Sequence, residues 1–472
     1  MLIENLFSLR PPRPLRFIFF CLMAIGAPAW AADEMPDELV QLVVDLLADK
    51  DKDIRALGFE QVRTGAKGQA ATKLFAAQLA KLPADAQAGL ISALADRGDA
   101  AARPAVLEAL ATSRDEAVRV AAIGALGPLG EAADVPRLAA ILGSGPPSEK
   151  QTARASLVRL AGDSAAKEIV SEMKKAAPPL RVALIEVLTA RRALTAVPEL
   201  CQAALDEEKS VRTAAMAALG QLAGPEHLAA MVQGVLRASK GAEREAAEKA
   251  VALVCSRIAD PAKRADPLLA AINPVQTHAS RAAMLPTLGR VGGPKALDVI
   301  EAAIADPALH DVGIRALCNW PDASTADRLI ELARTDEHAE HRDMARAALI
   351  RIAPLPDNRS DADRLALVKK VMGMCASDAE RNLVLKRAHA VRTVDTLRFL
   401  QPYVDQPQYA QQACESVVEL AHHRVLRDAN KAEFHALLDK VIETSKDATV
   451  IERANRYQKG QTWARPANPQ RS

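Results

Sequence analysis

The sequence predicts an all-α protein, an α-solenoid of about twelve stacked helix pairs that ends in a C-terminal helical cap. One helical pattern, clearest in residues 113–130, returns in weaker form about every 32 residues. Of the residues, 49% are hydrophobic but only 3% are aromatic, so the core must consist of Ala, Leu, Val and Ile. This composition favours close packing of helix on helix, because strands are usually richer in aromatic and β-branched residues.

Residues 113–130 contain the signals of a single amphipathic helix. Asp115 and Glu116 supply the negative charge that is favoured in a first helical turn, and Gly127 and Gly130 are expected to end the helix. Between them, an apolar stripe recurs at helical spacing: Val118, Ala122, Ala125, Leu126 and Leu129. An isolated helix of this length is marginal in water, so it requires neighbours that cover the stripe.

Residues 1–31 have the features of a secretory signal peptide. Three Arg residues precede an apolar segment from Phe17 to Ala27, and Ala29 and Ala31 form a small-x-small cleavage site. We expect cleavage before Ala32 and export to the periplasm or the extracellular space. The apolar segment is shorter than the roughly 20 residues that span a bilayer, so no membrane span is expected after cleavage; a retained anchor is the alternative.

The predicted mature chain has no net charge. The full sequence has 61 basic and 59 acidic residues, and the leader removes three Arg and one Glu, which leaves 58 of each. A nucleic-acid-binding protein normally carries a basic excess, so we expect no nucleic acid as a partner. Five cysteines remain, 39 to 63 residues apart and without a CxxC motif, and are interpreted as small buried hydrophobic residues.

The repeats are aligned on an anchor residue near the start of one helix of each pair. Four copies keep a Gly eight residues after an anchor Arg: Arg119 with Gly127, Arg154 with Gly162, Arg212 with Gly220, and Arg281 with Gly289. Eight further anchors are weaker copies: Arg55, Gln87, Arg181, Arg244, His310, Arg342, Arg381 and Gln411. The helix before the anchor helix often opens with a proline, at Pro104, Pro136, Pro198, Pro225, Pro267 and Pro294. Each unit is therefore a helix pair whose apolar face only the next pair can cover.

The pattern in residues 115–130, 208–224 and 281–292 resembles HEAT repeats, especially the bacterial HEAT-like, armadillo-type repeats related to those of phycobilin lyases. Residues 378–460 also look similar to the ends of HEAT arrays in secreted bacterial proteins. The resemblance implies a fold but assigns no activity, because the repeated residues are those that pack. The di-iron hydroxylases of this fold use repeated His-Glu dipeptides, which this sequence lacks.

The predicted domain organisation has five parts. A signal peptide (1–31) precedes a HEAT-like repeat array (32–353), and a linker or hinge (354–363) separates it from C-terminal repeats and a cap (364–458). A disordered tail (459–472) follows. The linker is rich in Pro, Asp, Asn and Ser, and it accompanies the widest gap between anchors, from Arg342 to Arg381.

Two candidate sites follow from the pattern. His338 and His341 fall on one helix face, with Glu337 four residues before His341, and could hold a metal between two imidazoles and a carboxylate. Charged residues are equally expected in a turn between helices for solubility, so the prediction is no catalytic residue and no cofactor. The other candidate is a row five residues after the anchors, whose charged members are Glu60, Arg159, Glu186, Lys249, Arg315 and Lys386. The anchor Arg residues themselves are interpreted as a ladder that joins adjacent units.

The sequence thus favours a non-catalytic protein–protein interaction scaffold in the cell envelope. A partner protein or peptide would bind on the concave face of the solenoid, where mixed charges suit a protein better than a polyphosphate or a membrane surface. The alternative is a metal-dependent enzyme or metal-binding accessory factor built on the same solenoid. A third possibility is an accessory array that serves a separately encoded secreted enzyme or cytochrome.

Overall fold

The computed structural model describes residues 37–65, 68–275 and 277–463, and every regular element that these residues form is a helix. The predicted signal peptide and residues 464–472 of the predicted tail lie outside the described residues. The chain divides into two compact units, one up to Arg191 and one from Arg192 onward. None of the described helices is both long enough and apolar enough to cross a membrane.

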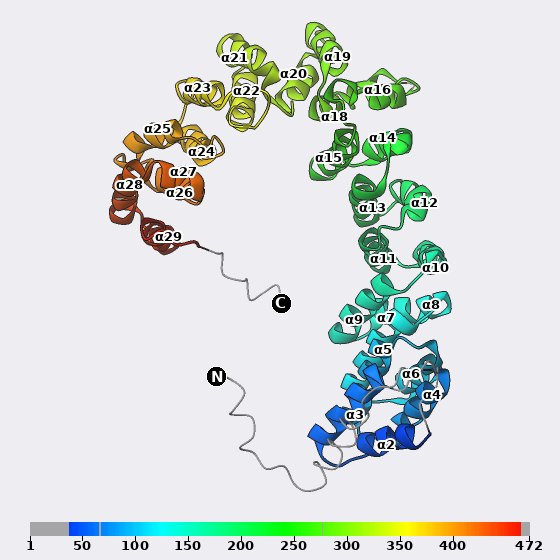
Figure 1. Ribbon diagram of the computed structural model, residues 1–472. Coiled ribbons are helices and arrows are strands. Elements are labelled where there is room, and N and C mark those ends of the chain that lie inside the picture. The colour runs from blue at the N-terminus through cyan, green and yellow to red at the C-terminus, as the bar shows by residue number, and fades with distance from the viewer. Residues whose placement is uncertain (1–36, 66–67, 276, 464–472) are drawn as a thin grey trace. The chain divides into compact units, whose positions relative to one another are not determined.

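The first unit consists of five helix pairs in two layers (Figure 1). The second helix of each pair carries the anchor position and packs against the second helices of the neighbouring pairs. We call this layer the anchor layer and the other the flanking layer. In the first unit the anchor layer contains α3 (Lys52–Thr64), α5 (Ala84–Arg97), α7 (Glu116–Leu129), α9 (Pro147–Arg159) and α11 (Pro178–Ala190). Its flanking layer contains α2 (Asp37–Leu47), α4 (Gln69–Ala76), α6 (Arg103–Thr112), α8 (Val135–Ser144) and α10 (Asp163–Lys175).

The second unit repeats this arrangement over eight pairs (Figure 1). Its anchor layer contains α13 (Lys209–Leu222), α15 (Ala242–Ser256), the short α17 (His278–Ala282) with α18 (Leu285–Val291), α20 (His310–Cys318), α22 (Ala339–Ile352), α24 (Asp378–Ala388), α26 (Ala410–Ala421) and α29 (Ala448–Gln458). Its flanking layer contains α12 (Val197–Ala203), α14 (Leu228–Arg237), α16 (Asp266–Ile272), α19 (Pro294–Ala305), α21 (Ala326–Thr335), α23 (Asp361–Met372), α25 (Val394–Val404) and α28 (Lys431–Thr444). A short helix, α27 (Arg424–Ala429), joins α26 to α28. The predicted stack of about twelve helix pairs with a C-terminal helical cap is confirmed.

Helix α7 shows why these segments are helical. The side chain of Asp115 accepts a hydrogen bond from the Val118 amide and caps the first turn. The predicted apolar stripe is confirmed, since all five of its residues are buried between neighbouring helices. The proline prediction is also confirmed, because five of the six prolines occupy the first turn of a flanking helix, and Pro225 opens the 3₁₀ turn before α14.

Gly127 has a different role from the one that the sequence predicts. It lies inside α7 and is buried, and the helix continues to Leu129. A Cβ atom at this position would lie 3.4 Å from the Cα of Ser156 and 3.4 Å from the Cβ of Arg159, both in α9. The glycine therefore permits close approach of consecutive anchor helices rather than ending its own helix.

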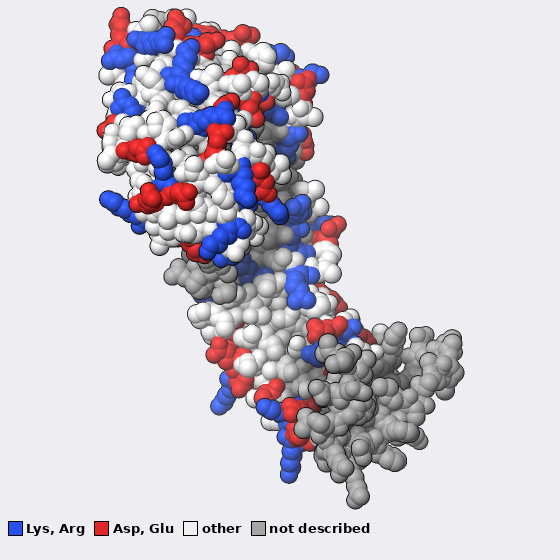
Figure 2. All heavy atoms as spheres, turned by 60° about the vertical axis from the view of Figure 1, so that its left-hand side comes forward, with Lys and Arg blue, Asp and Glu red and all other residues white. Residues whose placement is uncertain are grey.

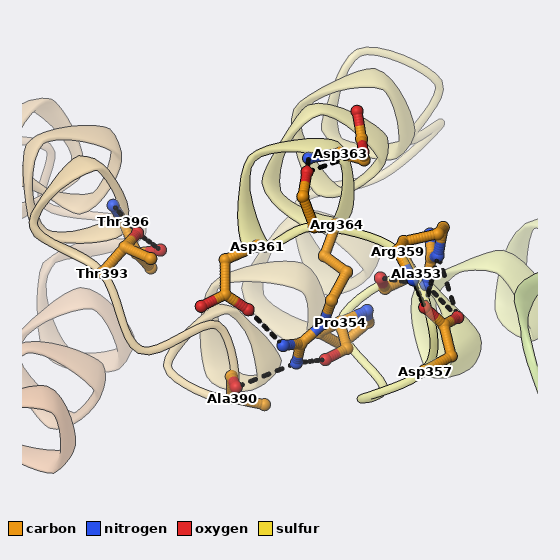
Figure 3. A network of polar contacts seen from close by, with 11 residues as sticks. Ala353, Pro354, Asp357, Arg359, Asp361, Asp363, Arg364, Ala390, Thr393 and Thr396 are labelled. Atoms are coloured by element: carbon orange, nitrogen blue, oxygen red, sulfur yellow. Dashed lines mark hydrogen bonds and ion pairs between the residues drawn. The ribbon is translucent and has the colours of Figure 1, made fainter.

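The predicted linker, Pro354 to Asp363, lies within the second unit; it follows α22, and its last three residues form the first turn of α23 (Figure 3). The buried guanidinium of Arg364 bonds the Asp361 carboxylate at 2.6 Å, the Pro354 carbonyl at 2.5 Å and the Ala390 carbonyl at 3.1 Å. Arg359 is paired with Asp357 at 2.8 Å. The bonds of Arg364 tie α23 to the start of the segment and to the turn after α24, while the division between the compact units falls at residues 191 and 192. A hinge at 354–363 stays a prediction.

Candidate functional site

The anchor residues act inside the repeat array. Arg212 donates from Nη1 to the carbonyls of Asp206 at 2.8 Å and Glu207 at 2.7 Å, which end the preceding flanking segment. The same bond to a carbonyl five to nine residues back is made by Arg55, Arg119, Arg181, Arg244, Arg281, Arg342 and Arg381. Gln87 makes it from its amide nitrogen to the Leu82 carbonyl at 2.9 Å. In these nine repeats the anchor side chain therefore caps the helix end that precedes it.

Three anchor Arg residues also join one repeat to the next. The partner is an acidic residue in the first turn of the following anchor helix: Arg55 with Asp85 at 2.7 Å, Arg119 with Glu149 at 2.7 Å, and Arg212 with Glu243 at 2.8 Å. The ladder interpretation is thereby confirmed for these positions. The pair in the second unit is the most buried, with 8% of the Arg212 side chain and 2% of the Glu243 side chain exposed.

The charges of these partners are stabilised by their hydrogen bonds. Burial alone would raise the pKa of Glu243, but bonds from Arg212 and Ser239 outweigh it and hold that pKa below its usual value. For Glu149, the hydrogen bond from Arg119 is the largest influence and lowers the pKa of the carboxyl group against the effect of burial. Both carboxylates therefore contribute to stability in the charged form.

Arg154 does not occupy the position that its spacing from Gly162 predicts. It lies one helical turn later in α9 than Arg119 lies in α7, it is exposed, and it pairs with Glu186 at 2.6 Å. Gly162 is the N-cap of α10 with φ 84° rather than a packing glycine. The eight-residue spacing was therefore coincidental in this repeat.

A second row of Arg residues was not predicted. These residues lie at the end of an anchor helix and donate to carbonyls at the end of the preceding anchor helix, 31 to 37 residues back. They are Arg97, Arg191, Arg257, Arg351 and Arg387. For example, Arg351 bonds the Cys318 carbonyl at 2.9 Å and the Trp320 carbonyl at 2.7 Å. In the sequence, such a residue could be found as an Arg that follows the end of one anchor helix by about one repeat.

All six predicted partner-binding residues are exposed and belong to the anchor layer. Glu60, Arg159 and Glu186 lie in the first unit, and Lys249, Arg315 and Lys386 lie in the second. Glu60 and Lys386 each follow their N-cap by nine residues, as Glu186 does, whereas Arg159 lies about a turn further along its helix. The face in view in Figure 2 has basic and acidic side chains interspersed. That these residues bind a partner stays a prediction.

The second unit has two hollows beside its shortest helices. One, of about 630 Å³, lies between α16, α18 and α19 and has an apolar lining that includes Leu269, Leu285, Leu288 and Val299. The other, of about 710 Å³, is lined by Trp320 together with prolines and polar residues, and it reaches the predicted linker.

The histidine cluster has a different composition from the one predicted. His341 is buried at the start of α22, and its Nδ1 lies 3.1 Å from the Asp336 carboxylate. His310, one repeat earlier at the start of α20, lies beside it, with ring centroids 5.6 Å apart. His310, Asp336 and His341 place one possible ligand atom each within 4.8 Å of one another. The sequence paired His341 with His338 and Glu337 and missed His310 and Asp336, although His310 and His341 are 31 residues apart, which is one repeat.

His338 lies at the rim of this cluster. Its side chain is 63% exposed, and its Nδ1 lies 3.5 Å from Asp336. Asp336 accepts a hydrogen bond of 2.9 Å from the His338 amide. Burial raises the pKa of Asp336, but this bond and the one from His341 leave that pKa below its usual value. The cluster therefore holds a buried, charged carboxylate between imidazoles.

The five cysteines of the described residues are free thiols. Four are buried, as predicted, and Cys318 is partly exposed. Burial raises the pKa of the Cys255 and Cys318 thiols to about 12 and that of the Cys375 and Cys414 thiols to about 11. They therefore stay protonated and unreactive at neutral pH.

Comparisons with known proteins identify the repeat. The family model for HEAT repeats matches residues 72–158 and 166–252, which correspond to α4 through α15. No curated protein matches the chain in sequence. Similar solved structures include the karyopherin Kap121p bound to the extreme C-terminus of the protein phosphatase Cdc14p, at 12% identity and a TM-score of 0.45, with 92% of this chain and 57% of the karyopherin covered.

Kap121p bound to Pho4p is similar at 12% identity and a TM-score of 0.44, with 94% of this chain and 57% of that chain covered. This chain therefore spans little more than half the length of the karyopherin that it matches. The identification of the repeat rests on the family model together with the stacked helix pairs. Residues 72–158 and 166–252 therefore match HEAT repeats, and the other helix pairs of the described residues share their helix-pair arrangement.

Proposed function

We propose that the protein is a non-catalytic interaction scaffold of the cell envelope, which binds another protein through the exposed face of its anchor layer. The observation that supports this proposal is that packing residues and exposed residues occupy different positions along each anchor helix. The repeated residues, both apolar and Arg, are used in contacts between repeats, whereas the residues at the predicted partner positions are exposed. The exposed positions vary in charge and size from repeat to repeat, as recognition of a specific partner surface requires.

The chemistry of the exposed row favours a protein partner. Two of its six charged members are acidic and four are basic, and they alternate with small residues such as Ser92 and Ala217. Glu186 already has a cationic neighbour, Arg154, at 2.6 Å. A polyanion would meet carboxylates along this row, whereas a protein surface can present charges of both signs. The location in the cell envelope rests on the predicted signal peptide.

Charge reversal of the row tests the proposal. The variant Glu60→Lys, Arg159→Glu, Glu186→Lys, Lys249→Glu, Arg315→Glu and Lys386→Glu should lose the proteins that cross-link to the wild-type mature chain in its own envelope. Its free energy of unfolding, measured in urea, should stay within about 1 kcal/mol of that of the wild type, because exposed charges contribute little to stability.

A matched control reverses two acidic and four basic exposed residues of the flanking layer: Glu108, Arg137, Lys167, Arg237, Asp298 and Lys369. This control should keep the cross-linked partner. If both variants kept the cross-linked partner, or both lost it, the assignment of the binding face to the anchor layer would be contradicted. Cross-links that map to the apolar hollow around Leu285 would instead place the partner on the flanking side of the second unit.

A further inference from the structure

We infer that His310, Asp336 and His341 form a binding site for a divalent transition-metal ion of the zinc class. This inference does not depend on the proposed function. The three residues come from three consecutive helices, since His310 begins α20, Asp336 caps the end of α21, and His341 lies in the first turn of α22. Three of the nine histidines of the chain, counting His338, are gathered at this one place.

His310 is oriented as a metal ligand would be. Its Nδ1 lies 2.7 Å from the Ile304 carbonyl oxygen, and because a carbonyl only accepts, Nδ1 carries the proton. The lone pair of the neutral imidazole is then on Nε2, which is not used by this bond. Metal-binding histidines characteristically donate their other ring N–H to a carbonyl or carboxylate in this way.

The remaining two ligands are already in contact. His341 and Asp336 have only 7% and 6% of their side chains exposed, and the carboxylate oxygen lies 3.1 Å from Nδ1 of His341. The amide of His338 donates to the same carboxylate oxygen at 2.9 Å and fixes its position. The exposed Asp311 carboxylate lies 3.3 Å from Nε2 of His341 and offers a further oxygen at the rim.

The size of the cluster suits a single ion after a small adjustment. Two atoms that ligate one tetrahedral zinc ion at about 2.1 Å each lie about 3.4 Å apart. The three candidate atoms all lie within 4.8 Å of one another, so side-chain rotations that shorten the longest separation by about 1.4 Å would bring them into range. Two imidazoles and one carboxylate favour zinc, cobalt or nickel over calcium or magnesium, which prefer ligand sets of oxygen alone.

The competing explanation is that the same residues serve only as helix caps. His310 would then cap the end of α19 by donating a hydrogen bond to the Ile304 carbonyl, as the anchor Arg residues do for other carbonyls. The chain shows that glutamine can also do this, because Gln87 bonds the Leu82 carbonyl at 2.9 Å. The substitution His310→Gln therefore keeps the cap and removes the metal ligand, which separates the two explanations.

The experiment is calorimetric titration of the mature chain with zinc chloride, after purification without a histidine tag and removal of metal with a chelator. We expect one equivalent of zinc to bind, and cobalt to give a visible absorption band from a site with nitrogen ligands. His310→Gln and Asp336→Asn should each weaken zinc binding at least about tenfold. Asp336→Asn keeps an oxygen that can accept from the His338 amide, so it serves as a second variant that should fold.

The urea midpoint of the metal-free protein should be the same for wild type and His310→Gln. The control His435→Gln removes an imidazole from α28, far along the chain, and should bind zinc as wild type does. A wild-type chain that takes up no stoichiometric zinc would overturn the inference. So would a His310→Gln variant that binds zinc as tightly as wild type, or a His435→Gln variant that loses it equally.

Discussion

Arg212 and Glu243 should stabilise the second unit far more than Arg154 and Glu186 stabilise the first, although both pairs join consecutive repeats. Their distances are 2.8 Å and 2.6 Å. The side chains of the first pair are 8% and 2% exposed, whereas those of the second pair are 47% and 46% exposed. The two pairs thus differ in burial, and also in the two carbonyl bonds that Arg212 makes in addition to its ion pair.

The substitution Arg212→Met leaves the Glu243 carboxylate buried without its cation. Loss of one partner of a buried pair costs about 3–5 kcal/mol, whereas an exposed pair is worth about 0–1 kcal/mol. Arg212 also loses its bonds to the Asp206 and Glu207 carbonyls, which adds to the cost. We therefore expect Arg212→Met to destabilise by at least about 3 kcal/mol and Arg154→Met by less than about 1 kcal/mol.

Urea unfolding followed by circular dichroism measures both effects, and Trp320 fluorescence reports on the second unit because that side chain is buried there. Double-mutant cycles with Glu243→Gln and Glu186→Gln isolate the coupling within each pair. The coupling should exceed about 1 kcal/mol only in the buried pair. Equal destabilisation by Arg212→Met and Arg154→Met would refute the reasoning that burial determines the strength of these bridges.

Two further predictions concern packing and pH. A Cβ at Gly289 would collide with the Ala316 carbonyl oxygen, whereas one at Gly124 would meet only the Thr152 side chain at 3.5 Å. Gly289→Ala should therefore lower the free energy of unfolding in urea by about 1–3 kcal/mol. Gly124→Ala should leave it unchanged or raise it by up to about 1 kcal/mol. Similar effects of the two substitutions would contradict the close approach at Gly289. Burial lowers the pKa of His389 from 6.5, and nearby Arg residues lower it further against the opposing charge of Glu419. Below pH 6.5 the unfolded chain then binds more protons than the folded chain, so the free energy of unfolding should decrease as the pH drops through 6.5. In the same urea titrations, the free energy of unfolding of His389→Gln should decrease less steeply.

The fold was predictable because its signals are local. The apolar stripe of α7, the Asp115 cap and the prolines in the first turns of the flanking helices each act within one or two helical turns. Their return at a regular period was sufficient to count the pairs. The alignment failed at Arg154, because its spacing to Gly162 matched the pattern by chance. Arg154 lies one turn later in α9 than Arg119 lies in α7.

The candidate sites were less predictable because their residues meet across repeats. His341 was identified from its neighbours in sequence, but His310 reaches it from the preceding repeat and Asp336 from the end of α21. Arg351 likewise bonds carbonyls more than 30 residues back. Such contacts depend on the register between successive helices, which the spacing within one helix does not reveal.

At the repeats where it occurs, the second row of Arg residues makes the end of an anchor helix depend on the repeat that follows it. Arg97, Arg191, Arg257, Arg351 and Arg387 all reach back to satisfy carbonyls at the end of the previous anchor helix, and none of these bonds runs in the opposite direction. Removal of repeats from the C-terminal side would uncover helix ends in the part that remains. Removal from the N-terminal side would leave these guanidinium groups without their carbonyls, and loss of α3, α7 or α13 would also leave Asp85, Glu149 or Glu243 without its anchor Arg. The bonds of this row therefore have a polarity of their own: each one satisfies the helix end of the repeat before it.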